Sequence, residues 1–178
     1  MGGMSLKRRI GIPVAGLLLG GLIYLGLSLV IVNQALVAEV WEIEERPQEL
    51  GLSFEDVEFS PRGWPELTLR GWWLPAENPK GTVIRVHGLD SNKGYRLGLV
   101  QGLVEGGYSV LTFDLRGHGE SDLAKMGAGV HEQDDVLGAI DYVLENRGAN
   151  AGEVYLHGLS YGAAIALMAG AEEPAVGG

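Results

Sequence analysis

The hydrophobic residues of this chain form one long uninterrupted run near its start, followed by shorter runs that polar segments separate. Residues 10–32 contain no charged side chain. As an α-helix this segment would be about 35 Å long, enough to cross the roughly 30 Å hydrocarbon core of a membrane. Basic residues at 7–9 precede it and acidic residues at 39–45 follow it. By the positive-inside rule, we predict a cytoplasmic segment over 1–9, a single membrane-spanning helix over 10–32, and an extracytoplasmic remainder.

A cleaved signal peptide is the alternative interpretation of this segment. The apolar core of a signal peptide is usually about 7–15 residues long and ends in a small-x-small cleavage site. The run here is longer, and the best cleavage site, after Ala38, has Leu36 where a small side chain is needed. The pattern therefore favours an uncleaved anchor, followed by a linker over residues 33–50.

Beyond residue 50, the hydrophobic period alternates between that of strands and that of helices. Strands are predicted over 54–59, 67–74, 82–86, 109–113 and 154–156, and helices over 95–105, 131–146 and 163–169. The first two strands form a hairpin, and the later strand–helix–strand order is typical of a parallel sheet with right-handed crossovers. In the helix over 131–146, Val136 and Ile140 belong to the apolar face and Asp135 to the polar remainder. We therefore predict an α/β domain over 51–178 with a doubly wound, mostly parallel sheet, whose ligands bind at the carboxyl ends of the strands.

Composition and charge narrow the classes of function. The chain has no cysteine, which excludes disulfide scaffolds and thiol nucleophiles. Residues 41–178 carry 10 Lys and Arg against 22 Asp and Glu, and so acidic a domain lacks the basic face that nucleic acids need. The sequence from His131 to Asp135 begins like a zinc-binding H-E-x-x-H motif but has no second histidine. We therefore expect no nucleic acid, metal or organic cofactor to bind.

A G-x-S-x-G motif, from Gly158 to Gly162, lies between a predicted buried strand and a predicted helix rich in small residues. This context is typical of a nucleophile elbow, a tight strand-to-helix turn that raises a serine hydroxyl above the sheet. A side chain at either glycine position would collide with the neighbouring strand or helix. The pattern makes Ser160 the candidate nucleophile and aims the amide groups of the following helix at the reacting carbonyl.

Two further motifs lie at predicted strand ends. They are Val86-His87-Gly88 and Phe113-Asp114-Leu115-Arg116-Gly117-His118-Gly119-Glu120-Ser121. In this order, and together with the serine motif, they resemble the α/β-hydrolase superfamily, in particular its lipase, esterase and lysophospholipase-type members. The resemblance implies that Ser160 attacks a carboxylic ester to form an acyl-serine intermediate, with an oxyanion hole made by the backbone N–H groups of Leu89 and Tyr161. The residues expected to shape the site are His87, Gly88, Asp114, Arg116, Gly117, His118, Gly119, Gly158 and Gly162.

The triad acid and histidine are the parts of such a site that this sequence does not supply. Members of the superfamily place both well after the serine, but residues 161–178 contain neither Asp nor His. All four histidines precede the serine; we expect His87 and His118 to form loops, His131 to begin a helix and His157 to be a satisfied core residue. We therefore expect the hydrolase domain to be incomplete at its C-terminus. Such a piece would be inactive and aggregation-prone, with a bare apolar edge on the strand over 154–156.

Three classes of function stay open from the sequence. The first is a membrane-anchored serine hydrolase that acts on a small-molecule ester or acyl substrate. The second is a serine peptidase or thioesterase on the same fold, and the third is a catalytically inactive, anchored interaction domain. The sequence specifies neither the substrate, nor the lid that would cover it, nor the oligomeric state.

Overall fold

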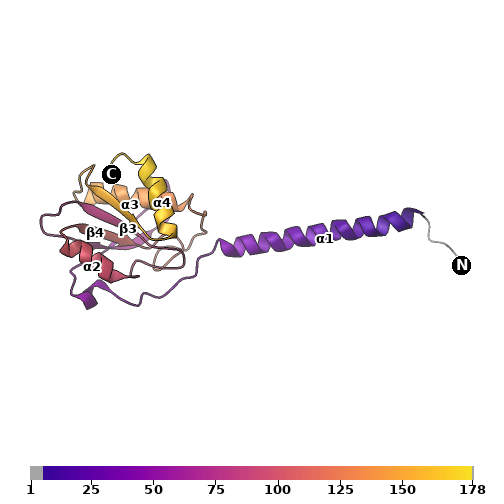
Figure 1. Cartoon of the computed structure of the whole chain (residues 1–178), viewed down its shortest axis with the longest axis horizontal. Coiled ribbons are helices and arrows are strands. Elements are labelled where there is room, and N and C mark those ends of the chain that lie inside the picture. The colour runs from indigo at the N-terminus through magenta and orange to yellow at the C-terminus, as the bar shows by residue number, and fades with distance from the viewer. Residues whose placement is uncertain (1–5, 178) are drawn as a thin grey trace. The chain divides into compact units, whose positions relative to one another are not determined.

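The computed structural model describes residues 6–177 of the chain, with side chains from residue 14 onward. The backbone divides into two compact units, one ending at Leu36 and one beginning at Val37. The elements are α1 (Leu6–Ala35), a 3-10 helix η1 (Pro47–Leu50), β1 (Glu55–Phe59), β2 (Leu69–Leu74), β3 (Thr82–Val86), α2 (Leu97–Glu105), β4 (Ser109–Phe113), α3 (Glu132–Asn146), β5 (Val154–Gly158) and α4 (Tyr161–Glu172) (Figure 1). Residues 1–5 of the predicted cytoplasmic segment and the last residue of the predicted domain lie outside the described residues.

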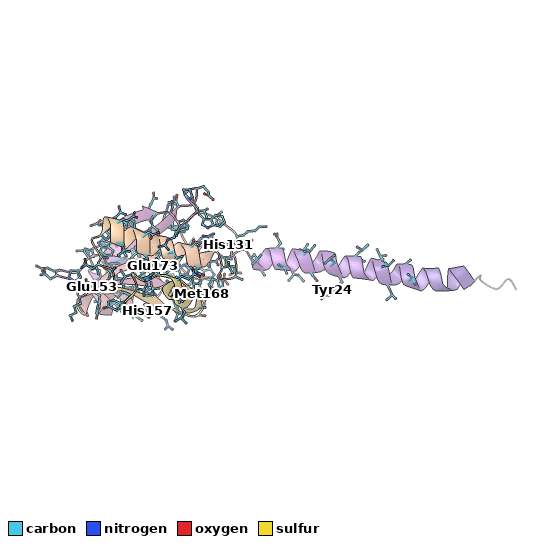
Figure 2. All side chains as sticks on the ribbon, turned by 90° about the horizontal axis from the view of Figure 1, so that it is seen from above. Tyr24, His131, Glu153, His157, Met168 and Glu173 are labelled. Atoms are coloured by element: carbon cyan, nitrogen blue, oxygen red, sulfur yellow. The ribbon has the colours of Figure 1, made fainter. Side chains whose placement is uncertain are left out.

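Helix α1 contains the whole of the predicted run over 10–32. Its apolar side chains, Tyr24 among them, point outward around the helix (Figure 2), and they are largely exposed. A helix that is apolar on every side and not covered by protein is typical of a membrane span. The stretch Val14–Ala35 is long and apolar enough to cross a membrane, a test that a signal sequence near an N-terminus also passes.

The five strands form one mixed sheet in the order β1-β2-β4-β3-β5. Strand β2 pairs antiparallel with both β1 and β4, whereas β3 pairs parallel with both β4 and β5. In this register Ile84 of β3 has Leu111 of β4 on one side and Leu156 of β5 on the other. The predicted α/β fold with a mostly parallel sheet is therefore confirmed. Because β3, β4 and β5 run in the same direction, their carboxyl ends meet at one edge of the sheet.

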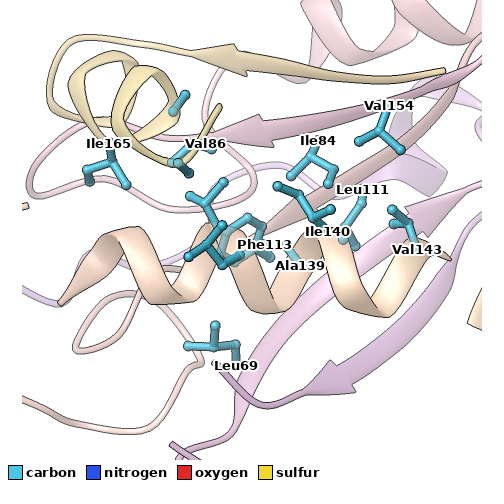
Figure 3. Close-up of a cluster of buried hydrophobic side chains, with 14 of the residues drawn as sticks. Leu69, Ile84, Val86, Leu111, Phe113, Ala139, Ile140, Val143, Val154 and Ile165 are labelled. Carbon is cyan, nitrogen blue, oxygen red and sulfur yellow. The ribbon is translucent and has the colours of Figure 1, made fainter. Parts of the chain in front are cut away.

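Helices cover both faces of the sheet, α3 and α4 on one face and α2 on the other (Figure 1). The larger core contains Ile84, Val86, Leu111 and Phe113 of the strands, Ile140 and Val143 of α3, and Ile165 of α4 (Figure 3). The smaller core contains Trp72, Leu74, Val83 and Val110 of the strands, and Leu97 and Val100 of α2. Successive side chains of a strand point to opposite faces, and because helices cover both faces, every residue of β3 and β4 is buried.

Several details differ from the sequence predictions. Helix α2 begins at Leu97 rather than at residue 95, because Arg96 adopts a left-handed backbone conformation with φ 56° and ψ 51°. Strand β5 continues to Gly158 and α4 begins immediately after Ser160, so strand and helix are closer in sequence than predicted. Asp135, predicted on the polar face of α3, is instead fully buried.

Strand β5 lies at the edge of the sheet, and this edge is partly covered. Val176 forms an isolated parallel bridge with Val154, and the N–H of Gly177 donates to the carbonyl of Val154 at 2.8 Å. The remaining side of β5 and the adjacent face of α4 line an apolar cavity of about 630 Å³, to which Leu156 and Ala166 contribute. The prediction of a wholly bare edge is therefore wrong at the first residue of the strand, where the end of the described chain folds back against it.

Candidate active site

Ser160 occupies the turn between β5 and α4. Its backbone has φ 52° and ψ −117°, a conformation that residues with a side chain rarely adopt. The residue is exposed, at the carboxyl end of β5. It also directly precedes the first turn of α4, where the amide groups of a helix have no intrahelical acceptor. A hydroxyl group thus stands in a strained strand-to-helix turn, beside the N–H of Tyr161. The next two N–H groups, of Gly162 and Ala163, already donate to the carbonyl groups of Leu159 and Ser160.

Gly158 and Gly162 let the strand, the turn and the helix approach one another closely. A Cβ atom at position 158 would overlap the backbone of Gly162 and Ala163. A Cβ atom at position 162 would overlap the carbonyl groups of Val86 and His87 at the end of β3. Any side chain at either position would push α4 away from the sheet, so this turn requires glycine on both sides of the serine.

The end of β3 brings Gly88 and Leu89 beside the serine. A Cβ atom on Gly88 would lie 3.6 Å from the Cβ of Ser160 and 3.4 Å from the carbonyl oxygen of Leu159. These four residues line one cavity of about 260 Å³. Within the part of the chain that the structure describes, the backbone N–H groups of Leu89 and Tyr161 donate to no protein acceptor. Both amide groups therefore keep their hydrogen-bonding capacity for a ligand.

His87 and His118 are buried and connect the loop after β3 with the loop after β4. The Nδ1–H of His87 donates to the carbonyl of Gly88 at 2.7 Å, and the N–H of Leu115 donates to His87 Nε2 at 3.0 Å. The two imidazole rings pack edge to face, with centroids 5.0 Å apart. Burial, with a smaller contribution from His118, lowers the pKa of His87 to about 3. The ring of His87 is therefore neutral, and the backbone occupies both of its nitrogens.

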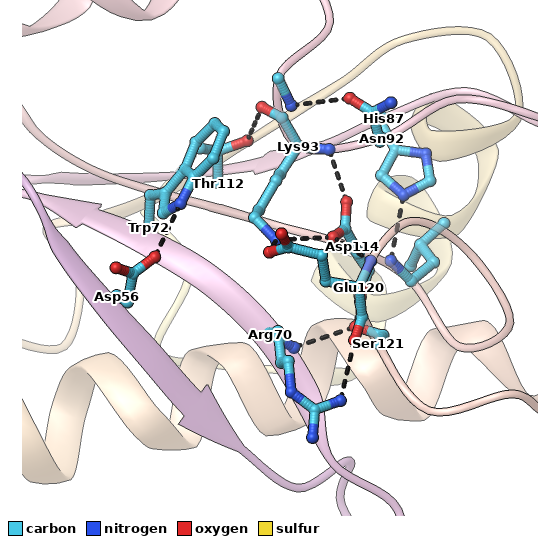
Figure 4. Close-up of polar contacts among 12 residues, drawn as sticks. Asp56, Arg70, Trp72, His87, Asn92, Lys93, Thr112, Asp114, Glu120 and Ser121 are labelled. Carbon is cyan, nitrogen blue, oxygen red and sulfur yellow. Dashed lines mark hydrogen bonds and ion pairs between the residues drawn. The ribbon is translucent and has the colours of Figure 1, made fainter. Parts of the chain in front are cut away.

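Asp114 joins the same two loops through its buried carboxylate (Figure 4). The carboxylate accepts hydrogen bonds from Lys93 N at 2.6 Å, from Lys93 Nζ at 2.8 Å and from Glu120 N at 2.9 Å. The Lys93 ammonium also binds the carboxylate of Glu120 at 2.6 Å and lies 5.1 Å from the ring centroid of Trp72. Both oxygens of Asp114 thus hold backbone and lysine groups, and the loop that carries Leu89 is fixed through them.

Arg116 attaches the loop after β4 to helix α3. Its Nε and Nη2 donate to Asp135 Oδ1 at 2.8 and 2.6 Å, and its backbone N–H donates to Oδ2 at 3.0 Å. Burial raises the pKa of Asp135 to about 6, although Arg116 acts in the opposite direction. Gly117 and Gly119, in the same loop, both have positive φ. This pairing explains the burial of Asp135, which its place in the helical pattern did not predict.

Tyr161 connects the start of α4 with the loop before α3. Its hydroxyl donates to Oε2 of Glu132 at 3.0 Å. Glu132 is fully buried and also accepts the N–H groups of Gly127 at 2.8 Å and Gly129 at 2.7 Å. Burial and the nearby carboxylate raise the pKa of the Tyr161 hydroxyl, so it stays a hydrogen-bond donor. The residue after the serine is therefore held at its side chain while its backbone N–H stays free.

Sequence reasoning assigned no role in the site to Lys93, Glu132 or Asp135. Lys93 lies 21 residues from Asp114 and 27 from Glu120, so its partners form no local motif. Glu132 follows His131 at a helix start, where an acidic residue is ordinary. The one usable signal was the adjacent pair Asp134 and Asp135. If either carboxylate faces the core, it needs a hydrogen-bonded partner of opposite charge there.

The four histidines have no hydrogen bond to Ser160 in the described part of the chain. His131 is exposed at the start of α3, with its ring 5.5 Å from that of Trp64. His157 is only partly buried, and its Nδ1 has no hydrogen-bond partner there, as is also true of Nε2 of His118. The prediction of a satisfied core histidine at 157 is therefore wrong, because β5 is an edge strand and offers its side chain no polar partner. Over the same described residues, no group of three or more His, Asp or Glu side chains is arranged to bind a metal ion.

A mostly parallel sheet with helices on both faces and a serine at a strand-to-helix turn defines the class: the chain has an α/β-hydrolase fold. Solved structures agree. The esterase Pf2001 of Pyrococcus furiosus is similar with a TM-score of 0.71 and 26% identity, over 79% of this chain and 55% of that one. The α/β-hydrolase GrgF of Penicillium sp. sh18 is similar with a TM-score of 0.63 and 30% identity, over 70% of this chain and 44% of that one.

Within this class, the chain belongs to the family described as serine aminopeptidase, S33, whose model matches residues 77–178. Among curated relatives, the uncharacterized protein YfhR of Escherichia coli K12 is 34% identical over 120 residues, which cover 65% of this chain and 41% of that protein. YfhR of Salmonella typhimurium LT2 is 37% identical over 106 residues, which cover 57% of this chain and 36% of that protein. The match thus spans about two fifths of the length of these relatives.

Proposed function

We propose that this chain carries the nucleophile and the oxyanion hole of a membrane-anchored serine hydrolase that cleaves carboxylic esters. The observation that carries the proposal is the backbone of Ser160, which is held at φ 52° in an exposed turn between β5 and α4. Strain of this kind costs about 1–3 kcal/mol and persists where function uses it. The esterase name of the similar Pyrococcus protein supports an ester as the substrate.

In the proposed reaction, Ser160 Oγ attacks the ester carbonyl carbon and its proton passes to a general base. The backbone N–H groups of Leu89 and Tyr161 bind the oxyanion that forms, and each such donor typically contributes about 3 kcal/mol. The intermediate then expels the alcohol, which takes the proton from the base, and an acyl-serine is left. Attack by water on this acyl group releases the carboxylic acid and restores the serine hydroxyl.

The general base is, in this proposal, a histidine from outside the described residues. His87 is neutral, but both of its nitrogens are hydrogen-bonded to the backbone. The other three histidines form no hydrogen bond with Ser160 among the residues described. The match covers only 36–41% of the YfhR proteins, and this partial coverage is consistent with a base supplied by another part of the protein.

Labelling with a fluorophosphonate tests the nucleophile, and it is best done on the complete gene product in detergent micelles. The wild type and the Ser53→Ala variant, which changes an exposed serine far from the motif in sequence, are expected to be labelled. Ser160→Ala is expected to lose the label. A folded wild-type protein without any serine adduct would instead support the inactive, anchored interaction domain.

The family description favours a second candidate, a serine aminopeptidase. Hydrolysis of p-nitrophenyl butyrate and of leucine p-nitroanilide by the same preparation separates the two, with a butyryl thioester as a third arm for a thioesterase. A higher kcat/KM for the ester is expected. A higher kcat/KM for the anilide would replace the ester assignment, while Ser160 would keep its role.

We also propose that α1 anchors the protein, with the hydrolase domain on the extracytoplasmic side. The chain has no cysteine, so single cysteines can report which side each unit occupies. A membrane-impermeant maleimide applied to intact cells is expected to modify Ser53→Cys and to leave Ser5→Cys unmodified until the membrane is permeabilised. The reverse pattern would contradict the proposed orientation.

A further inference from the structure

The segment that follows α1 packs against the loop beside the candidate nucleophile. The N–H of Glu39 donates to Asp90 Oδ1 at 3.0 Å. The side-chain amide of Asn92 donates to the carbonyl groups of Trp41 and Glu42, at 3.3 and 3.1 Å. Residues 39–42 are therefore hydrogen-bonded to the loop that also carries Leu89.

Close packing continues after Glu42. A Cβ atom on Gly94 would lie 2.8 Å from the carbonyl oxygen of Glu45 and 2.9 Å from Cγ2 of Ile43, so only glycine leaves room for this segment. The loop beneath is also fixed from the sheet, because the buried guanidinium of Arg85 donates to the carbonyl groups of Lys93 and Tyr95. Residues 39–45 and the loop after β3 are thus closely packed and form one continuous surface.

This surface places Trp41 in the wall of the cavity that contains Ser160. The cavity of about 260 Å³ is lined by Trp41 and Tyr95 as well as by Leu89 and the serine. Trp41 and Tyr95 also line a second cavity of about 570 Å³, which adjoins the first along these shared residues. Trp41, Leu89 and Tyr95 are 53%, 48% and 42% exposed, so three large side chains present uncovered apolar area around the hydroxyl.

We infer that Trp41 is a specificity-determining residue, which binds the apolar acyl chain of an ester together with Leu89 and Tyr95. The inference rests on the proposed function and adds to it a substrate class, neutral esters with a medium-length acyl chain. An indole offers a large, rigid apolar face, and each methylene that it covers contributes about 0.8 kcal/mol. The indole N–H donates to the carboxylate of Glu39 at 3.3 Å, which holds the ring in place.

The charge around the second cavity supports a neutral acyl chain. Glu42, Glu44 and Glu45 line it, against Arg96 as the one cation among its lining residues. Such a concentration of carboxylates repels an anionic group and disfavours substrates with a second acid function. A chain without charge meets no such repulsion and gains from the apolar faces of Trp41 and Tyr95.

The test compares kcat/KM for p-nitrophenyl acetate and octanoate, using the complete gene product in detergent micelles. Trp41→Ala is expected to lower the octanoate-to-acetate ratio about tenfold, mostly through a higher KM for octanoate, while Trp41→Phe keeps most of the preference. Leu99→Ala, at a similarly exposed position on α2 outside both cavities, is the matched control and should leave the ratio unchanged. Presenting the octanoate ester either in solution or in phosphatidylcholine vesicles distinguishes a soluble from a membrane-borne source.

A second variant tests the docking of the segment itself. Asn92→Asp keeps the acceptor that binds the N–H of Gly94 at 2.9 Å but replaces the donor to Trp41 and Glu42 by a carboxylate that repels their carbonyl groups. It should lower the octanoate-to-acetate ratio as Trp41→Ala does. An unchanged ratio in both variants, with Ser160 still labelled by fluorophosphonate, would overturn this inference alone. If the wild type were not labelled by fluorophosphonate, the proposed function would be overturned instead.

Discussion

Lowering the pH from 7 to 5 is expected to weaken the folded domain through one identifiable group, the buried imidazole of His87. In the folded state its Nε2 accepts the N–H of Leu115, and its Nδ1–H donates to Gly88. A proton on Nε2 would remove the acceptor for Leu115 and place a charge beside His118, whose ring centroid is 5.0 Å away. The folded state therefore resists protonation, while the unfolded state does not.

The size of the effect follows from the two pKa values. Burial lowers the pKa of His87 from 6.5 to about 3 in the folded protein. At any pH between these values the unfolded chain binds a proton that the folded chain does not, so the free energy of unfolding falls as the pH falls. At about 1.36 kcal/mol for each pH unit below the unfolded pKa, protonation of His87 in the unfolded chain lowers the free energy of unfolding by about 2 kcal/mol at pH 5.

Urea denaturation of the full chain in detergent, followed by near-ultraviolet circular dichroism at pH 7 and pH 5, measures this loss. His87→Gln keeps an acceptor for Leu115 but cannot titrate, so it should lose about 2 kcal/mol less than the wild type over this range. His131→Gln, at the exposed position immediately before α3, serves as the matched control and should lose as much as the wild type. If His87→Gln were as acid-sensitive as the wild type, other groups would carry the effect and the reasoning about His87 would be refuted.

Two further predictions concern packing and buried charge, and urea denaturation at pH 7 measures both. Gly162→Ala should lower the free energy of unfolding by about 3 kcal/mol because its methyl group overlaps the backbone of β3, whereas Gly98→Ala, at an open position of α2, should raise it by up to about 1 kcal/mol. Lys93→Met should cost about 3–5 kcal/mol because it leaves the carboxylate of Asp114 buried without its cation, whereas Glu58→Gln, which breaks an exposed ion pair, should cost at most about 1 kcal/mol. Equal losses within either pair of variants would contradict the packing or the charge argument, respectively.

The strands were the most predictable part of the fold. Residues 82–86 and 109–113 are strands with the predicted bounds, because each is buried over its whole length and lies between helices on both faces of the sheet. The start of α2 was less predictable. Arg96 adopts a left-handed conformation, which is usually found at glycine, so the sequence does not predict it. The helix begins only after this residue.

The candidate site also has a predictable part and an unpredictable part. The order of the motifs placed His87, Asp114 and Ser160 at the ends of parallel strands, and topology alone brings such ends to one edge of a sheet. The partners of these residues were not predictable. In the sequence, nothing distinguishes Lys93 from a surface lysine, and Trp41 lies in the predicted linker. Only in the fold does Lys93 contact Asp114 and Trp41 line the cavity of Ser160.

By itself, the sequence determined the apolar helix, the alternation of strands and helices, and the glycines that a tight turn needs, because each of these depends on neighbours a few residues away. Only the tertiary structure decided which charges are buried. Removing Lys93 or Asp135 from water is unfavourable unless a partner of opposite charge lies within hydrogen-bonding distance, and those partners, Asp114 and Arg116, are distant in sequence. The free energy of a buried ion pair thus depends on a distance that exists only after the chain has folded.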